Sequence, residues 1–425
     1  MAADGRIERK NEMNKARIAV LANGMKAIFV PCEAESAAAG VFVANGSRWE
    51  SAKEAGVSHF IEHMLFKGTR KMRPADISRA VEGRGGNFNA FTSEEATCYY
   101  VHIPGEYLAD AVDILSDMYF NATIPEEEFA REKCVILEEK KMYDDDPSSV
   151  AMENLQASLF RGTPLAMPVI GTEKSLLAMT ASDLREYIAS HYTPLRTVVV
   201  VVGDFDPAAC RRAVESRFCH SRRRGASPKR AAVRLVSPPT PEVTVKRDIK
   251  QTQLALGFRT GGMEDDSRYA LSVLDGVLGR GMSSRLFLNL RERRGLSYDI
   301  SSRAQLFRGA GMLGICAGLD ATKAGAVLAA VEKEIGRLRE KCVGAAELKR
   351  VKEFLTGNFR LSHEKIMSKL VYCGSSMLSF GRVLPVKDEV DRVRSVTADE
   401  IRALASRIFV DSRRAVSWVV PRGWQ

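Results

Sequence analysis

The chain has 425 residues, of which 45% are hydrophobic and 27% charged, and its formal net charge is +10. This length is too great for one ordinary core and suits two domains of roughly 200 residues each. Because it contains no run of about 18 apolar residues and no apolar leader, we expect no membrane-spanning helix, no secretory signal and a cytoplasmic location.

The first predicted elements are strands, followed by helices. Residues 17–31 predict a hairpin around Asn23 and Gly24, and residues 37–47 predict a further strand. Apolar residues at helical spacing predict a helix over 105–121. Strands and helices come in groups rather than in strict alternation. We therefore expect an α+β fold in which each domain has an antiparallel-rich sheet with helices packed on one face.

The stretch SHFIEHMLFKGT at 58–69 places two histidines and a glutamate on one face of a helix. His59, Glu62 and His63 occupy positions i, i+3 and i+4. Two imidazoles one turn apart can hold one zinc ion, and H-x-x-E-H is a known zinc-peptidase signature. The alternative is a core or surface helix with two satisfied histidines. Only six histidines occur in the chain, which favours the metal site.

A third, acidic ligand is expected from another helix, and the segment 125–147 is the best candidate. Pro125 and the acids after it predict a helix start. Glu132 and Glu139 are seven residues apart and therefore share a face. A solvated acidic stripe is the alternative, and spacing alone does not choose among Glu132, Glu138 and Glu139.

A basic segment followed by prolines predicts the domain boundary. Residues 210–234 hold much of the positive charge, and three prolines follow between 238 and 241. We read this as a solvated linker rather than a nucleic-acid site, because no aromatic platforms accompany the charge. The predicted division is an N-terminal domain over 1–222, a linker over 223–243 and a C-terminal domain over 244–425.

The two halves contain a faint internal repeat. Residues 179–206 and 396–423 each predict a helix opened by a threonine (Thr180, Thr397), then a loop and an apolar strand. The offset between the two segments is 217 residues.

A second pair of segments has nearly the same offset. Residues 59–68 align with 272–281 at an offset of 213, so that Ser272, Asp275 and Gly276 take the places of the two histidines and the glutamate. The second copy keeps the apolar pattern without the histidines, so the core of such a domain does not require them.

These motifs resemble those of the pitrilysin-type inverzincin peptidases, specifically the mitochondrial-processing-peptidase group and its bacterial relatives. The resemblance extends from about Ala16 to Val420. The segments that carry it lie at 56–69, 85–100, 132–147 and 279–300. The chain departs from the family at 162–171, where Thr163 and Ala166 replace the usual residues.

The resemblance implies a zinc site within a two-domain clamshell. One Zn²⁺ per chain would be held by His59, His63 and Glu139, with Glu62 as the general base. Glu132 would support the ligands from behind. The second domain would hold no metal.

The resemblance also implies substrate-binding residues from both domains. Arg291 and Tyr298 of the second domain would stabilise the oxyanion. Read from spacing alone, Arg291 would belong to a solvated helix end and Tyr298 to a core strand. An edge strand would bind an extended peptide. Its matching residues are Asn89, Ala90, Phe91 and Thr92.

The activity implied is that of a zinc metalloendopeptidase that cuts unfolded peptides or presequence-like segments enclosed between the domains. A homodimer is expected, and neither nucleic acid nor membrane is an expected partner. The alternative is a non-catalytic or weakly active subunit of a hetero-oligomeric processing peptidase.

Overall fold

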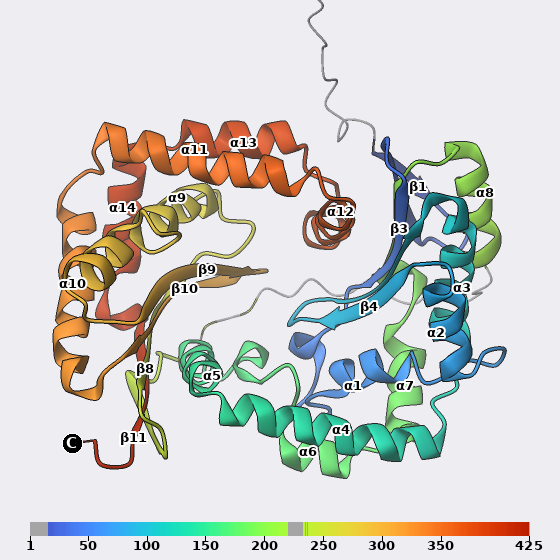
Figure 1. Ribbon diagram of the computed structural model, residues 1–425, viewed down its shortest axis with the longest axis horizontal. Helices are drawn as coiled ribbons and strands as arrows, with labels where there is room; N and C mark the ends of the chain where they lie inside the picture. The colour runs from blue at the N-terminus through green and yellow to red at the C-terminus, as the bar shows by residue number, and fades with distance from the viewer. Residues whose placement is uncertain (1–15, 220–232, 234, 236, 425) are drawn as a thin grey trace, which may run out of the picture.

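The protein consists of two similar halves that face each other, as the computed structural model shows (Figure 1). It describes residues 16–219, 233, 235 and 237–424. Most of the predicted linker over 223–243 lies outside the described residues.

The first half is built on a six-stranded sheet with the strand order β1-β2-β6-β3-β5-β4. Its strands are β1 (Arg17–Val20), β2 (Lys26–Pro31), β3 (Ser36–Val43), β4 (Asn87–Thr92), β5 (Thr97–Pro104) and β6 (Thr197–Gly203). Its helices are α1 (Val57–Met64), α2 (Pro74–Glu82), α3 (Leu108–Asn121), α4 (Glu126–Asp145), α5 (Pro147–Leu159), α6 (Glu173–Ala178), α7 (Ala181–His191) and α8 (Pro207–Phe218).

The second half has a five-stranded sheet with the strand order β7-β11-β8-β10-β9. Its strands are β7 (Glu242–Arg247), β8 (Thr252–Thr260), β9 (Asp299–Phe307), β10 (Ala310–Leu319) and β11 (Arg414–Pro421). Its helices are α9 (Arg268–Leu278), the π-helix η6 (Phe287–Arg293), α10 (Ala324–Glu340), α11 (Ala345–Ser362), α12 (Ile366–Phe380), α13 (Val386–Ser395) and α14 (Ala398–Ile408).

The strand pairing confirms the internal repeat and the α+β fold class. In each sheet one pair is parallel, β2 with β6 and β7 with β11, and the remaining pairs are antiparallel. The same strand is left at the sheet edge in both halves, β4 in the first and β9 in the second. This symmetry places equivalent clefts at equivalent edges.

Several elements predicted from the sequence are confirmed. The hairpin of β1 and β2 and the helix α3 occur where they were expected. Thr180 and Thr397 each cap a helix in a capping box. The threonine side chain accepts a hydrogen bond from the backbone N–H of Asp183 or Glu400, whose carboxylate accepts one from the threonine backbone N–H. These local signals, and not distant contacts, therefore fix where α7 and α14 begin.

No helix in the described part of the chain is long and apolar enough to cross a bilayer. All eight cysteines are free thiols. The fold is therefore held by packing rather than by disulfides.

The second face of each sheet is covered by a helix from the other half (Figure 1). Helix α12 packs on β3 and β6 of the first half, where Leu370 and Cys373 join a core with Phe42. Helix α5 packs on β8 and β11 of the second half, where Leu155 and Leu159 are fully buried. The halves thus exchange one helix each, and the central strands of both sheets are buried on both faces.

Replacing Gly374 of α12 with Ala is expected to lower the free energy of unfolding by about 1–3 kcal/mol. A Cβ at this position would lie 2.6 Å from three ring atoms of Phe42, and that ring is fully buried. The midpoint of urea denaturation measures the effect. Gly357 of α11 is the matched control, because a Cβ there would meet nothing within 4 Å. Gly357→Ala is expected to be neutral or stabilising by up to about 1 kcal/mol. Equal losses at both glycines would contradict this packing.

Candidate metal centre

Helix α1 presents its polar residues on one side because its other side is anchored in the core. Phe60, Ile61 and Met64 are fully buried. The helix begins after Gly56, whose φ of +92° favours glycine. The backbone N–H groups of Gly56 and Ser58 donate hydrogen bonds of 2.7 and 2.8 Å to the buried carboxylate of Glu50. The start of the helix is therefore fixed at Val57, two residues before His59.

Helix α4 brings its glutamates to the same place. The rings of Phe60 in α1 and Phe129 in α4 stack with their centroids 4.7 Å apart, and Ile136 is fully buried between the helices. Glu132 and Glu139 lie on the face of α4 that this packing turns toward α1. Glu138 points away: its side chain is 71% exposed and pairs with Lys141.

The donor atoms of His59, His63 and Glu139 converge on one point. The Nε2 atoms of His59 and His63 lie 3.7 and 3.5 Å from Oε2 of Glu139, and all three donors lie within 4.8 Å of one another. Two ligands that are each about 2.1 Å from a tetrahedral zinc ion are roughly 3.4 Å apart. Two imidazoles and one carboxylate at these distances therefore fit zinc and leave one position open for water.

Glu132 contacts His63 on the side of the ring that faces away from Glu139. Its Oε1 lies 2.8 Å from Nδ1 of His63, and its Oε2 lies 2.6 Å from Nζ of Lys67. The side chain is almost fully buried. This contact holds the His63 ring with Nε2 toward Glu139, as expected for the carboxylate partner of a metal-binding histidine.

The ionisation of these groups reflects burial and their close partners. Burial, followed by the charge of His63, lowers the pKa of His59 to about 4. Burial lowers the pKa of His63, but hydrogen bonds to Glu132 and Glu139 raise it to about 9. The bond with His63 lowers the pKa of Glu139, and burial raises that of Glu62. A cation that binds here therefore displaces a proton from His63.

A cavity of about 480 Å³ opens beside the three donors. Glu62 lines it, and its Oε2 is buried without a hydrogen-bond partner. Ala90, Phe91 and Thr92 of the edge strand β4 line the same cavity. Asn89 is exposed and its side chain accepts a hydrogen bond from the next backbone N–H. Among the described strands β4 pairs with β5 alone, so its other edge can accept a further strand.

Residues that the sequence did not single out complete this cavity. The loop at 166–170, within the segment where the chain departs from the family, forms one wall. Met152 and Glu153 come from α5, and Gln305 comes from β9 of the second half. Helix α5 and β9 reach the site through the contacts between the halves, which leave no local pattern in the sequence.

The turn after β4 is tied to the second half. The carboxylate of Glu94 accepts hydrogen bonds of 2.9 Å from Gln156 and 3.2 Å from Gln305. The neighbouring Glu95 accepts the backbone N–H of Arg308 at 3.0 Å and pairs with Arg48. The position of the edge strand therefore depends on where the second half lies.

Arg291 and Tyr298 do not line this cavity. Arg291 is exposed on η6, where its guanidinium stacks on the Phe287 ring, and Tyr298 is 63% exposed directly before β9. Seven residues of strand separate Tyr298 from Gln305, which is roughly 23 Å. Tyr298 is thus not a core residue, and the role of both side chains at the metal centre stays a prediction.

Comparison with known proteins finds the same architecture in zinc proteases. The family model described as insulinase, peptidase family M16, matches residues 31–173, and the model described as the peptidase M16 inactive domain matches 178–355. A Bacillus subtilis protein described as an uncharacterized zinc protease is 33% identical over 91% of this chain and 94% of its own. A zinc protease of Mycobacterium tuberculosis, also described as uncharacterized, is 36% identical over 94% of this chain and 91% of its own.

Solved structures share the whole fold. A protease from Helicobacter pylori superimposes with a TM-score of 0.88 at 20% identity, covering 96% of this chain and 99% of that chain. A peptidase M16 inactive domain from Pseudomonas fluorescens gives a TM-score of 0.87 at 19% identity, covering 96% and 98%.

Proposed function

Because this chain belongs to peptidase family M16, whose members bind zinc, we propose that it is a zinc-dependent endopeptidase acting on unfolded peptides between its two halves. The observation that carries the proposal is the convergence of His59, His63 and Glu139 beside Glu62, whose buried Oε2 has no hydrogen-bond partner among the described residues. A metal site without a nearby base would support only a structural role. The edge strand at the same cavity supports a peptide as the substrate.

Each side chain at the centre has a distinct task in this proposal. His59, His63 and Glu139 would hold the ion, which when bound supplies Lewis acidity for water and for the substrate carbonyl. Glu62 takes the proton from the attacking water and returns it to the leaving amine. Glu132 keeps the His63 ring oriented, through the hydrogen bond to Nδ1.

The peptide would bind as an added strand on β4. Backbone groups of Ala90 to Thr92 would pair with the extended substrate and bring one peptide bond over the cavity. Backbone pairing requires an extended chain, so folded proteins are excluded. Main-chain contacts discriminate weakly between sequences, which suits a presequence-like or otherwise unfolded substrate.

In this proposal Arg291 and Tyr298 reach the metal centre when the two halves close on the substrate. Both side chains are exposed and lie on the half opposite the metal centre. A guanidinium and a phenol can donate hydrogen bonds to an oxyanion once the halves approach each other. The ties of Glu94 and Glu95 to the second half link such closure to the position of the substrate strand.

Removal of the metal is expected to abolish hydrolysis of an unstructured quenched-fluorescence peptide, and one equivalent of zinc is expected to restore it. The chelator should lower the rate at least about a hundredfold, because the ion supplies both activation of water and polarisation of the carbonyl. The initial rate is measured before chelation, after it and after addition of zinc. Magnesium is the control, because it prefers oxygen ligands and should not restore the rate.

The same assay separates the proposal from a non-catalytic subunit. Such a subunit would bind zinc without cleaving peptides. The presence of all three donors together with Glu62 favours the enzyme. A zinc-loaded chain that cleaves no unstructured peptide would contradict the proposed activity.

A further inference from the structure

The second half contains a structural counterpart of the metal cavity. Helices α11 and α12 begin at Ala345 and Ile366, each 219 residues after the starts of α4 and α5 at Glu126 and Pro147. Helix α9 corresponds to α1, and the edge strand β9 corresponds to β4. The elements that surround the metal centre are therefore all repeated.

The same offset identifies the counterparts of Glu132 and Glu139 in the second half. Adding 219 to 132 and 139 gives 351 and 358, which are Val351 and Asn358. A Cβ on Gly276 would lie 2.6 Å from Cγ1 of Val351. This close contact corresponds to the contact of His63 with Glu132. Where the first half has the polar contact of His63 with Glu132, the second half has an apolar contact of Gly276 with Val351.

The counterparts of two metal ligands still line a cavity. Ser272, in the place of His59, and Asn358, in the place of Glu139, both line a hollow of about 590 Å³ among α9, α11, α12 and α13. Asp275, in the place of Glu62, is buried elsewhere with its carboxylate 2.6 Å from the Ser302 hydroxyl. The second half thus has a cavity at the equivalent place, with neither the metal ligands nor the base of the first half.

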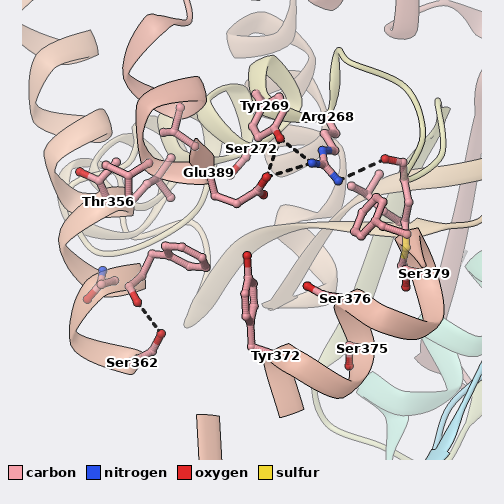
Figure 2. A pocket seen from close by; sticks show the side chains of 18 of the residues that line it. Arg268, Tyr269, Ser272, Thr356, Ser362, Tyr372, Ser375, Ser376, Ser379 and Glu389 are labelled. Carbon is pink, nitrogen blue, oxygen red and sulfur yellow. Dashed lines mark hydrogen bonds and ion pairs between the residues drawn. The ribbon is translucent and has the colours of Figure 1, made fainter. Parts of the chain in front are cut away.

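The chemistry of this cavity suits an uncharged ligand. Its walls are aromatic and aliphatic, with Leu355, Phe359 and Phe380 among them, and hydroxyl groups are interspersed. The charges are paired: Arg268 lies 3.1 Å from Glu389, as Figure 2 shows. Arg280 also contributes to the lining but is exposed to solvent. Away from Arg280, a charged ligand would have to break this partly buried pair or remain unpaired.

Further polar groups satisfy the pair inside the cavity. The Tyr269 hydroxyl donates a 2.7 Å hydrogen bond to Glu389 (Figure 2), and the Tyr372 hydroxyl of α12 donates its own hydrogen bond to the backbone carbonyl of Leu384. The volume lies within the roughly 300–1,000 Å³ of typical ligand pockets. It is large enough for two or three side chains of a peptide.

A third hollow, between the halves, adjoins both cavities. The metal cavity and a hollow between the halves share Glu94 and Gln305. That hollow and the second cavity share Met263, Leu306 and serines of α12. Gln305 and Leu306 are consecutive in β9, so one strand borders the whole path.

We propose that the second cavity binds an uncharged aromatic or aliphatic segment of the same peptide whose scissile bond lies at the metal centre. This inference rests on the proposed peptidase function and extends it to a second, non-cleaving subsite. The adjoining hollows offer a route for the peptide from the metal cavity to the second cavity. The ion pair of Arg268 and Glu389 favours a neutral segment in the second cavity.

The test uses peptides of one cleavage sequence that carry a Phe-Leu pair at increasing distance from the scissile bond. The distances are about three to nine residues, or roughly 10 to 32 Å of extended chain. Matched peptides carry Ser-Gly or Lys-Glu instead. Binding to zinc-loaded Glu62→Gln protein is measured by fluorescence anisotropy, and a short peptide without the pair reports hydrolysis by the unmodified chain.

At one spacing, the Phe-Leu peptide is expected to bind about tenfold more tightly than its Ser-Gly match, which is about 1.4 kcal/mol. Ser272→Phe, which fills the cavity, should remove this advantage. Ser406→Phe on the exposed side of α14 is the control and should keep it. Both variants should leave hydrolysis of the short peptide unchanged.

Several outcomes overturn the inference. These are the absence of an advantage at every spacing, an equal gain for Lys-Glu, or an advantage that survives Ser272→Phe. A benzophenone side chain in place of the phenylalanine gives a test that does not depend on any cavity variant. It should crosslink to α9, α11 or α12, and crosslinks confined to other segments contradict the inference. Failure to hydrolyse the short peptide contradicts the proposed peptidase function instead.

Discussion

Replacing Glu62 with Gln is expected to lower kcat/KM for an unstructured peptide by about a thousandfold, with zinc still bound. The amide keeps the shape of the side chain but cannot accept the proton of the attacking water, and general-base catalysis contributes about 10²–10⁴ in rate. Glu62 lies one helical turn after His59 and directly before His63, and within the described part of the chain its buried Oε2 has no hydrogen-bond partner. No other contact of that oxygen would be lost in the variant.

Rates are measured on zinc-loaded protein, together with the zinc content. Glu82→Gln on α2 is the control, because Glu82 is exposed in the same half and should not affect the rate. Hydrolysis by Glu62→Gln at the unmodified rate would refute the assignment of the base. Loss of zinc from that variant would instead show that Glu62 acts as a ligand.

Replacing Glu139 with Ala is expected to weaken zinc binding by more than about a hundredfold, with loss of activity at stoichiometric zinc. Glu139 supplies the donor atom that lies 3.5 and 3.7 Å from the two imidazole nitrogens. Even residues that only support a ligand cost about 10- to 100-fold in metal affinity, so a direct ligand should cost more.

Zinc affinity is measured by competition with a chromogenic chelator. Glu138→Ala is the matched control, since the residue is adjacent in α4 but its side chain is 71% exposed and faces away. Equal losses at both positions would refute the choice of Glu139. The comparison also tests the one choice that helical spacing left open.

The sequence predicts those parts of the site that lie on one helix. His59, Glu62 and His63 share a face because their spacing is local, and the loss of histidine in the second repeat marks them as functional. The third ligand lies on another helix, so spacing left three glutamates possible and the family resemblance selected Glu139. The resulting triad, His59, His63 and Glu139, is the one that converges in the structure.

Contacts between the halves could not be predicted in this way. Gln305 of the second half donates a hydrogen bond to Glu94 of the first half although 211 residues separate them. The periodicity of residues along the sequence does not predict a contact over such a separation. The same holds for α5 and α12, whose apolar faces predict burial but do not specify which sheet they cover. Their partners follow only from the arrangement of both halves.

The exchange of α5 and α12 has a consequence for how the chain holds together. Each half without its partner would expose one apolar sheet face, so neither is complete when produced alone. Mixed as separate chains, the halves would have to find each other by collision. Because the halves are joined covalently, each half meets the other at an effective concentration on the order of millimolar. The two halves therefore correspond to a dimer with exchanged helices in which the connecting segment has made association independent of protein concentration.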